Sequence, residues 1–327
     1  MNLPAIIARA YFALDAALDA AIVPSYTALG YRLRRALLWD ERDLDVDLSG
    51  QVIAITGGNS GIGYATAQAL AQRRATVCLL VRNADKGEAS RRQLLIDTRN
   101  PHIYVETLEL SSLDSVRDCV ARLRAQANRL NVLINNAGAE YRTRQVTADG
   151  LEASFATNVL GMFALTQGLR PLLAAAAPSR VLNVSSGGIY AAKLDVRDLQ
   201  FERKPFNNLA AYAQNKRAQV MLTELWAAFW RADGIRVNAM HPGWVDTPIV
   251  QAGLPTFRKV LGRLLRTPEQ GADTIVWLAA AKRIESITGE FWFDRRERPK
   301  HKTDRTRSPI EDYRALWDTC LSLTTRS

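Results

Sequence analysis

The sequence of 327 residues contains little cysteine and little histidine. Its three cysteines (Cys78, Cys119 and Cys320) lie far apart and form no C-x-x-C pair, and its three histidines are scattered. This distribution argues against a disulfide framework and against a zinc site, and it fits a reducing compartment. We therefore expect a cytoplasmic protein that holds no metal ion.

Long apolar runs are also missing. The N-terminal region is rich in Ala and Leu, but Arg9, Asp15 and Asp19 interrupt it, so no stretch of about 18 apolar residues exists to cross a bilayer. It also lacks the basic start and the contained apolar segment of a signal peptide. The apolar residues from Ala5 to Leu18 fit an amphipathic helix. We expect this helix to dock on the protein's own core or on a second subunit; peripheral contact with a membrane surface is the alternative.

The net charge of +10 is unevenly distributed. Residues 295–307 carry seven Lys and Arg residues against only Glu297 and Asp304. The favoured interpretation is a solvated or mobile basic tail; contact with acidic lipid head groups, nucleic acid or a phosphorylated ligand is the alternative. No nucleic-acid-binding motif accompanies the run, so we expect no nucleic-acid partner.

From residue 51 onward, short apolar runs alternate with longer helical stretches. The expected strands lie near residues 52–56, 76–81, 103–110, 131–138, 180–186 and 235–243. This alternation predicts the α/β class, with a doubly wound Rossmann-type parallel sheet flanked by helices. The functional loops should then lie at the carboxyl ends of the strands. We expect a helical N-terminal extension (1–48), one main domain (49–294) and a basic C-terminal tail (295–327) that ends in a short helix.

A glycine-rich segment, "TGGNSGIG", joins the first expected strand to the first expected helix. Glycines at positions 57, 61 and 63 allow the backbone to approach a pyrophosphate closely. The helix N-terminus adds amide donors and a partial positive charge. A tight turn alone would give the same letters, but the strand before it and the helix after it favour a dinucleotide site.

Tyr212 and Lys216 lie four residues apart in the segment "LAAYAQNKRAQV", which should be helical. Residues at this spacing share one helix face, and no other tyrosine of the sequence has lysine four positions later. A free phenol has a pKa of about 10, and nearby positive charge favours the phenolate. The pair therefore predicts a phenol acidic enough to exchange a proton with substrate; a solvated helix face is the alternative.

Four motifs in order resemble the short-chain dehydrogenase/reductase family. They are the spacing T-G-x-x-x-G-x-G, "NNAG" at Asn135–Gly138, Ser186, and the "YAQNK" segment. The resemblance covers about Leu48 to Phe293. The long segment between Ser186 and Tyr212 is similar to that of the retinol-dehydrogenase-like branch, and the chain also resembles an orphan group within the family. The resemblance implies an oxidoreductase that transfers hydride between a nicotinamide and a carbonyl or secondary alcohol, with a lipophilic substrate as the expectation.

The resemblance assigns a role to each of four residues. Tyr212 would exchange the proton with the substrate oxygen, and Lys216 would lower the pKa of that phenol and bind the nicotinamide ribose. Ser186 would hydrogen-bond the substrate carbonyl. Asn158 would hold a water in a proton relay, with a polar core residue that bends a helix as the alternative. A Ser–His hydrolase built on His241 is disfavoured because the sequence has no G-x-S-x-G motif.

The same resemblance implies a set of positions that contact the cofactor. In the glycine-rich loop they are Gly57, Asn59, Ser60, Gly61, Ile62 and Gly63. Tyr212 and Lys216 also belong to this set. The positions at the ends of later strands are Arg82, Asn83, Glu109, Leu110, Asn136, Ala137, Gly138, Pro242, Gly243, Val245 and Thr247.

The second expected strand ends in Val81 and Arg82, where enzymes that prefer NAD usually carry an acid for the ribose hydroxyl. A missing carboxylate and a guanidinium both suit a 2′-phosphate, so we predict NADP(H) over NAD(H); a solvent-facing Arg82 is the alternative. Glu109 stands where relatives usually carry an aspartate at the adenine ring. Relatives also form homodimers or homotetramers through two long helices beside the site. A dinucleotide-binding sensor or scaffold without turnover is the alternative function.

Overall fold

The structure, a computed structural model, describes residues 3–247, 258–259 and 261–325. In this part of the chain an eight-stranded sheet forms the centre, in the order β3-β2-β1-β4-β5-β6-β7-β8. The strands are β1 (Val52–Thr56), β2 (Thr76–Val81), β3 (Ile103–Thr107), β4 (Val132–Asn135), β5 (Ser179–Val184), β6 (Ile235–Met240), β7 (Phe291–Phe293) and β8 (Arg296–Arg298). Neighbouring strands are parallel except β7 with β8. The predicted doubly wound sheet is confirmed, and its order reverses between β1 and β4, where such sheets bind ligands.

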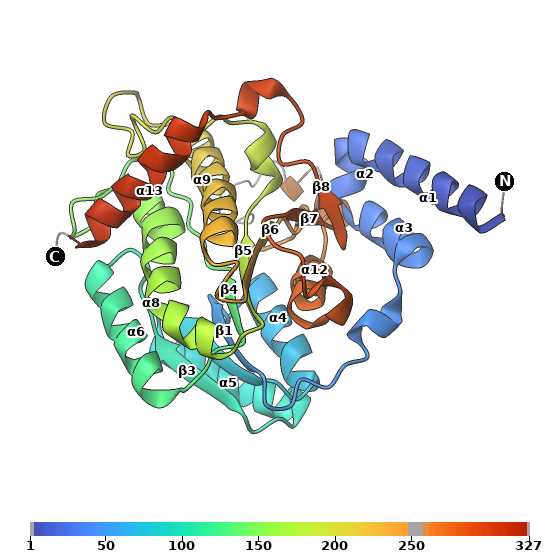
Figure 1. Cartoon of the computed structure of the whole chain (residues 1–327), viewed down its shortest axis with the longest axis horizontal. Helices are drawn as coiled ribbons and strands as arrows, with labels where there is room; N and C mark the ends of the chain where they lie inside the picture. The colour runs from blue at the N-terminus through green and yellow to red at the C-terminus, as the bar shows by residue number, and fades with distance from the viewer. Residues whose placement is uncertain (1–2, 248–257, 260, 326–327) are drawn as a thin grey trace.

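Helices cover both faces of the sheet (Figure 1). One face carries α6, α8 and α9, and the other carries α4, α5 and α12. Within β1, Ile53 and Ile55 point to the α4 side and Ala54 points to the α8 side, as the two-residue period of a strand requires. The helices on the two faces and in the connecting loops are α4 (Gly61–Gln72), α5 (Ala84–Thr98), α6 (Leu113–Gln126), α7 (Ala153–Phe155), η2 (Ala156–Leu160), α8 (Gly161–Ala175), η3 (Gly187–Tyr190), α9 (Asn208–Phe229), η4 (Gly262–Leu264), α12 (Pro268–Ala280) and η5 (Lys282–Ile284).

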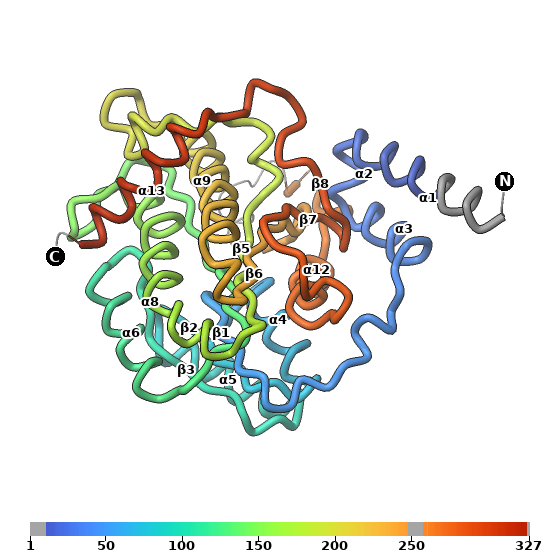
Figure 2. Tube along the Cα trace, viewed as in Figure 1, coloured from blue at the N-terminus to red at the C-terminus, as the bar shows by residue number. Residues whose placement is uncertain are grey.

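The N-terminal segment folds into α1 (Leu3–Ala20), α2 (Ile22–Tyr26), α3 (Ala28–Leu38) and η1 (Glu41–Leu44). Figure 2 shows α2 and α3 beside β7 and β8. Asp15 of α1 is 2% exposed and bonds Arg34 and Arg298, so the second half of α1 docks on the protein itself. On its outer side Phe12 stays 61% exposed. In the part of the chain that the structure describes, no helix is both long and apolar enough to span a membrane.

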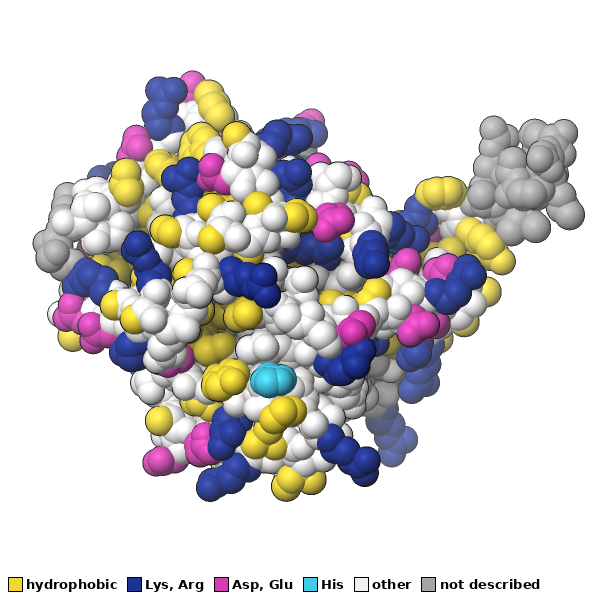
Figure 3. All heavy atoms as spheres, turned by 60° about the horizontal axis from the view of Figure 1, so that its bottom comes forward, with side chains coloured by type: hydrophobic (Ala, Val, Ile, Leu, Met, Phe, Trp, Pro, Cys, Tyr) yellow, Lys and Arg dark blue, Asp and Glu magenta, His cyan; other side chains and the backbone are white. Residues whose placement is uncertain are grey.

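The interpretation of residues 295–307 as a solvated tail was wrong for its first part. Residues 296–298 form β8 against β7, and Arg295 and Arg298 are 4% and 8% exposed. Asp273 neutralises Arg295, and Asp15 neutralises Arg298. Both aspartates lie on other elements, so the local composition of residues 295–307 does not reveal these ion pairs. Farther along, residues Lys302 to Arg305 are exposed, and the last two of them belong to η6 (Asp304–Thr306). On the face shown in Figure 3, basic side chains are spread among acidic and neutral ones.

The chain ends in α13 (Ile310–Thr325), which packs across α9. Leu316 and Cys320 are fully buried, and the ring of Trp317 meets Phe163 and Trp226 edge-on at 5.1 and 6.3 Å. The expected short terminal helix therefore contributes to the core on the α8 side of the sheet.

Candidate active site

The glycine-rich loop leads from β1 into α4. Gly57 and Gly61 adopt φ of +65° and +50°, in the left-handed region that favours glycine. A Cβ at Gly63 would lie 2.2 Å from the carbonyl oxygen of Gly57, so only glycine fits there. Ser60 is the N-cap residue of α4, and its side chain makes no capping hydrogen bond. The first amides of α4 thus point toward a space where an anion is favoured, and these residues fit a dinucleotide pyrophosphate.

The end of β4 is fastened to this loop. The hydroxyl oxygen of Thr56 accepts hydrogen bonds from the backbone amides of Asn136 and Ala137, both at 2.9 Å. Asn136 Nδ2 donates to the Thr56 carbonyl oxygen at 2.9 Å. A Cβ at Gly138 would lie 3.3 Å from Asn158 Oδ1 and 3.6 Å from Lys216 Nζ. The predicted cofactor positions 136–138 therefore lie between the glycine-rich loop and the predicted catalytic residues.

Tyr212 and Lys216 lie on α9, as predicted, and Lys216 Nζ is 5.6 Å from the centre of the Tyr212 ring. Ser186 follows β5 as the N-cap of η3, where its hydroxyl accepts from the Gly188 amide at 3.1 Å. Burial raises the pKa of Tyr212, and a hydrogen bond with Ser186 partly opposes this rise. In the structure the pKa of the phenol is therefore raised, whereas we expected the positive charges of Lys216 and an oxidised nicotinamide together to lower it.

Lys216 is 3% exposed, and burial lowers its pKa to about 7. Its ammonium donates to the Val184 carbonyl oxygen at 2.8 Å and to Gln219 Oε1 at 3.2 Å. Both acceptors are neutral, and neither offsets the cost of burying a charge as a carboxylate would. Burial therefore favours the neutral form of Lys216 more strongly than water does.

Asn158 lies in η2, a π-helical turn of a kind that is frequent at functional sites. Its side chain pairs with the backbone of Ala139, accepting from the amide at 2.8 Å and donating to the carbonyl at 2.7 Å. Its own backbone carbonyl accepts from Gln219 Nε2 at 2.7 Å. This link toward Lys216 uses the backbone carbonyl of residue 158, whereas the Asn158 side chain holds the backbone of Ala139, so its place in a proton relay stays a prediction beside the structural alternative.

Gln219 is a site residue that sequence reasoning missed. It is 1% exposed and connects the Asn158 carbonyl to the Lys216 ammonium. Its spacing from Lys216, three residues along the same helix, was the available signal, because such residues are neighbours on a helix surface.

The residues expected at the adenosine end lie at the ends of β2 and β3. The Arg82 side chain is 77% exposed, and its Nε lies 3.5 Å from Glu109 Oε2. The Asn83 side chain caps α5 by accepting from the Lys86 amide at 2.8 Å. Leu110 is buried, and its carbonyl oxygen would lie 2.0 Å from a Cβ at Gly161. Arg82 is thus the one basic side chain of this predicted group that is displayed to solvent.

The loop after β6 contains four predicted cofactor positions: Pro242, Gly243, Val245 and Thr247. Gly243 has φ of +79°, and the Pro242 carbonyl accepts from Arg266 Nη1 at 3.2 Å. Val245 is buried and pairs with Arg266 in an isolated bridge, and Thr247 closes the described part of this loop. His241 stacks on Phe293 at 3.9 Å; burial, reinforced by the nearby positive charge of Arg266, holds its pKa well below its usual value.

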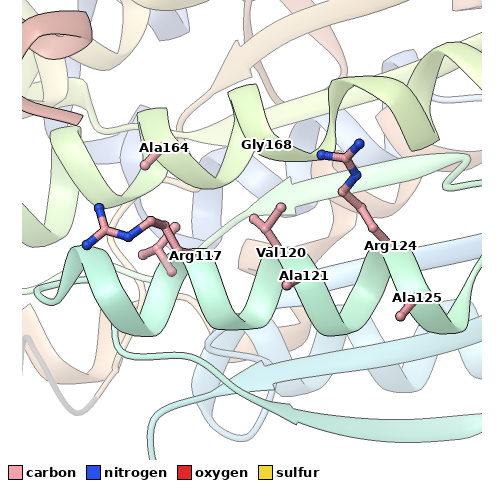
Figure 4. Close-up of a pocket in the computed structure, with 8 residues that line it drawn as sticks. Arg117, Val120, Ala121, Arg124, Ala125, Ala164 and Gly168 are labelled. Carbon is pink, nitrogen blue, oxygen red and sulfur yellow. The ribbon is translucent and has the colours of Figure 1, made fainter. Parts of the chain in front are cut away.

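A groove of about 520 Å³ lies between α6 and α8 (Figure 4). Its lining includes Val120, Ala164 and Gly168, with Arg117 and Arg124 along its edge. It shares no residue with the predicted catalytic or cofactor positions. The predicted catalytic and glycine-rich-loop positions lie elsewhere, at the carboxyl ends of β1, β4, β5 and β6 and on α9 and η2.

The comparison with protein families decides what kind of protein this is. A family model described as short chain dehydrogenase matches residues 51–256. The chain belongs to the short-chain dehydrogenase/reductase family. It is thus an oxidoreductase of the dehydrogenase/reductase type, built on a fold that binds a nicotinamide cofactor, as we expected from the motifs.

Relatives within the short-chain dehydrogenase/reductase family agree. Dehydrogenase/reductase SDR family member 12 from Bos taurus is 45% identical over 260 residues, 79% of this chain and 81% of that protein. Human retinol dehydrogenase 13 is 34% identical over 75% of this chain and 76% of its own length.

Solved structures show the same fold. An uncharacterised protein from Mycobacterium paratuberculosis has a TM-score of 0.68 and 30% identity, covering 88% of this chain and 97% of its own. The NADP complex of Pseudomonas aeruginosa RhlG has a TM-score of 0.62 and 26% identity, covering 75% and 94%.

Proposed function

We propose that the protein is an NADP(H)-dependent oxidoreductase that interconverts a carbonyl and a secondary alcohol on a substrate with substantial apolar surface. The observation that carries this proposal is the convergence of Tyr212, Ser186, Lys216 and Asn158 beside the glycine-rich loop. A protein that only sensed or displayed a dinucleotide would need the loop but not this set of proton-exchanging groups.

The chain's own residues perform the proton chemistry. When bound, the nicotinamide supplies hydride to the carbonyl carbon or accepts it from the alcohol. In the reductive direction, Tyr212 gives its phenolic proton to the carbonyl oxygen while the Ser186 hydroxyl donates a hydrogen bond to that oxygen. Lys216, held by Val184 and Gln219, provides the positive charge that favours the resulting phenolate.

The preference for NADP(H) is supported by Arg82. Its side chain is largely exposed, and its pair with Glu109 is long and partly solvated, so it contributes little free energy that a phosphate would have to replace. A guanidinium fits a phosphate through parallel hydrogen bonds, and no carboxylate stands at Val81 to repel it. The likeness to an NADP complex of RhlG points the same way.

An apolar substrate is supported by the start of α9. Leu209 precedes Tyr212 by three residues, so it lies on the same helix face, and it is 54% exposed. Phe206, just before α9, pairs edge-on with Phe201 at 5.5 Å. The similarity to human retinol dehydrogenase 13, named for a lipophilic alcohol, adds to this argument.

We also propose a cytoplasmic setting and self-association into a homodimer or homotetramer. Three buried, unpaired cysteines support a reducing compartment. The two long helices beside the site are α8 and α9, and α13 packs against both, so an assembly through this face would include α13. Sedimentation velocity of the full-length chain measures the state.

The experiment that tests the function is NADPH and NADH oxidation over a panel of lipophilic aldehydes and ketones, with Tyr212→Phe as the matched blank. We expect turnover with NADPH that disappears in Tyr212→Phe, while NADPH binding, followed by its fluorescence, is retained. Turnover that survives the substitution would refute the assigned role. Tight NADPH binding without turnover anywhere on the panel would favour a dinucleotide-binding sensor or scaffold.

A further inference from the structure

Tyr26, the last residue of α2, lies between two loops of the active site although it belongs to the N-terminal extension. Its ring is 6% exposed and packs edge-on against His241, Trp244 and Phe293, with ring centres 4.7, 5.7 and 5.1 Å away. A Cβ at Gly187, which directly follows Ser186, would lie 2.7 Å from a ring carbon of Tyr26. One aromatic ring thus supports both the loop after β5 and the loop after β6.

The backbone around Tyr26 also fixes the loop after β6. The Tyr26 carbonyl accepts from the Trp244 amide at 2.8 Å and from Arg266 Nε at 3.1 Å. The same arginine donates to the Pro242 carbonyl at 3.2 Å and to the Ser25 carbonyl at 3.0 Å. Residues 242–244 are therefore bound to the end of α2 directly and, through Arg266, a second time.

Arg266 is in turn held by a buried chain of charges. Asp294 accepts from Arg266 at 2.6 and 2.8 Å and from Arg34 at 2.8 Å. Arg34 also donates to Asp15 at 2.8 Å, and Asp15 accepts from Arg298 at 2.7 Å. Burial alone would raise the pKa of Asp15, but the hydrogen bonds and charges of Arg298 and Arg34 outweigh it and lower that pKa.

This network ties α1 and α3 to the end of β7 and to β8. All five side chains are at most 8% exposed, so each charge depends on its partners for solvation. Removing one partner from such a network leaves an uncompensated buried charge, and the elements therefore keep their relative positions. The extension is built into the catalytic domain on the side where Ser186 and Pro242 lie.

We propose that Tyr26 is a positioning residue, through which the N-terminal extension sets the conformation of the Ser186–Gly187 and His241–Trp244 segments for substrate and cofactor. The inference rests on the proposed function, because that function assigns Ser186 to the substrate and Pro242 and Gly243 to the nicotinamide. A merely structural Tyr26 would affect the stability of the protein without a selective effect on either segment.

The test compares full-length Tyr26→Leu with Tyr26→Phe and with Tyr31→Leu. Tyr31 is a control from the same extension: it is 5% exposed, its ring meets Trp39 and Arg266, and its hydroxyl bonds Asp273, so it reaches the loop after β6 only through Arg266. NADPH affinity is measured by fluorescence titration, and thermal stability is measured by calorimetry. Turnover is measured as NADPH oxidation with the best carbonyl substrate of the panel. Hydrogen exchange is followed in peptides that cover 241–247.

We expect Tyr26→Leu to weaken NADPH binding about tenfold and to lower turnover by about tenfold or more, since small misplacements of reacting groups are costly. Exchange at 241–247 should accelerate. Tyr26→Phe should stay within about twofold of the parent, and Tyr31→Leu should lose comparable stability while its NADPH affinity falls by no more than about twofold.

The proposal is overturned if Tyr26→Leu keeps the parent affinity and exchange rates, or if Tyr31→Leu loses as much affinity as Tyr26→Leu. Should Tyr26→Leu not fold, Tyr26→Met provides the same comparison with a longer side chain. A parent protein that binds no NADPH would refute the proposed function instead, and the exchange measurement would still report on the loop after β6.

Discussion

Gln219 Oε1 accepts a hydrogen bond from Lys216 Nζ at 3.2 Å, and its Nε2 donates to the Asn158 carbonyl at 2.7 Å. One neutral side chain therefore joins two predicted catalytic positions that lie on different helices, α9 and η2. This link orients the Lys216 ammonium without a counter-ion, and it leaves the pKa of the lysine under the control of burial.

Gln219→Leu should disturb this arrangement. It removes one acceptor of Lys216 and leaves the Asn158 carbonyl without its donor, a cost of about 1–3 kcal/mol in the free energy of unfolding. We expect turnover to fall about tenfold and its pH profile to change, because the Val184 carbonyl is then the one remaining acceptor named for Lys216. Gln167→Leu is the control. Gln167 Oε1 accepts a hydrogen bond from the Trp226 indole nitrogen, 3.1 Å away, and this pair lies outside the predicted site. A parent-like rate and pH profile in Gln219→Leu would remove Gln219 from the catalytic account.

Lys216 should make the stability of the protein depend on pH. Burial lowers its pKa from 10.5 to about 7, so between these values the unfolded chain binds more protons than the folded one. Stability therefore rises as the pH increases from about 7 to about 10.5. Relative to Lys216→Met, which lacks this titration, the parent should gain a few kcal/mol across that range. Urea denaturation of both proteins at several pH values measures the difference, and a constant difference would contradict it.

Arg82→Gln should change the choice of cofactor. Loss of a charge-assisted contact of about 1.5–3 kcal/mol predicts NADPH affinity lower by about 10- to 100-fold. NADH affinity should stay within about twofold, because it has no 2′-phosphate to lose. Arg92→Gln, at an exposed position of α5, controls for the change in net charge. Equal losses for both cofactors, measured by fluorescence titration, would refute the assignment of Arg82.

Leu316→Ala should destabilise the whole domain. Leu316 is 0% exposed in the core beneath α13, and truncation of such a side chain costs about 2–5 kcal/mol. Arg314→Ala, at an exposed position of the same helix, should stay within about 0.5 kcal/mol. Urea denaturation followed by circular dichroism compares the two. A neutral Leu316→Ala would show that α13 does not contribute to the cooperative core.

Part of the candidate site could be proposed from the sequence because its signals are local. The glycines of the first loop and the pair of Tyr212 with Lys216 lie at spacings that one turn or one helix turn fixes, whereas Ser186 was assigned through the family resemblance. Gln219 was accessible to the same reasoning, three residues from Lys216, but its importance lies in the Asn158 carbonyl, 61 residues away in the chain. Every residue has a backbone carbonyl, so the sequence does not indicate which carbonyl a distant side chain will contact.

The sequence by itself determined the alternation of strands and helices, the glycine-rich turn and the tyrosine–lysine pair, because backbone sterics and helix periodicity act over a few residues. Only the tertiary structure decided that Arg298 is buried rather than solvated, since its partner Asp15 is 283 residues away. It likewise placed Tyr26 of the extension against Gly187 and Trp244. Ion pairs and ring contacts join residues that are far apart in the sequence, so their partners are known only once the chain has folded.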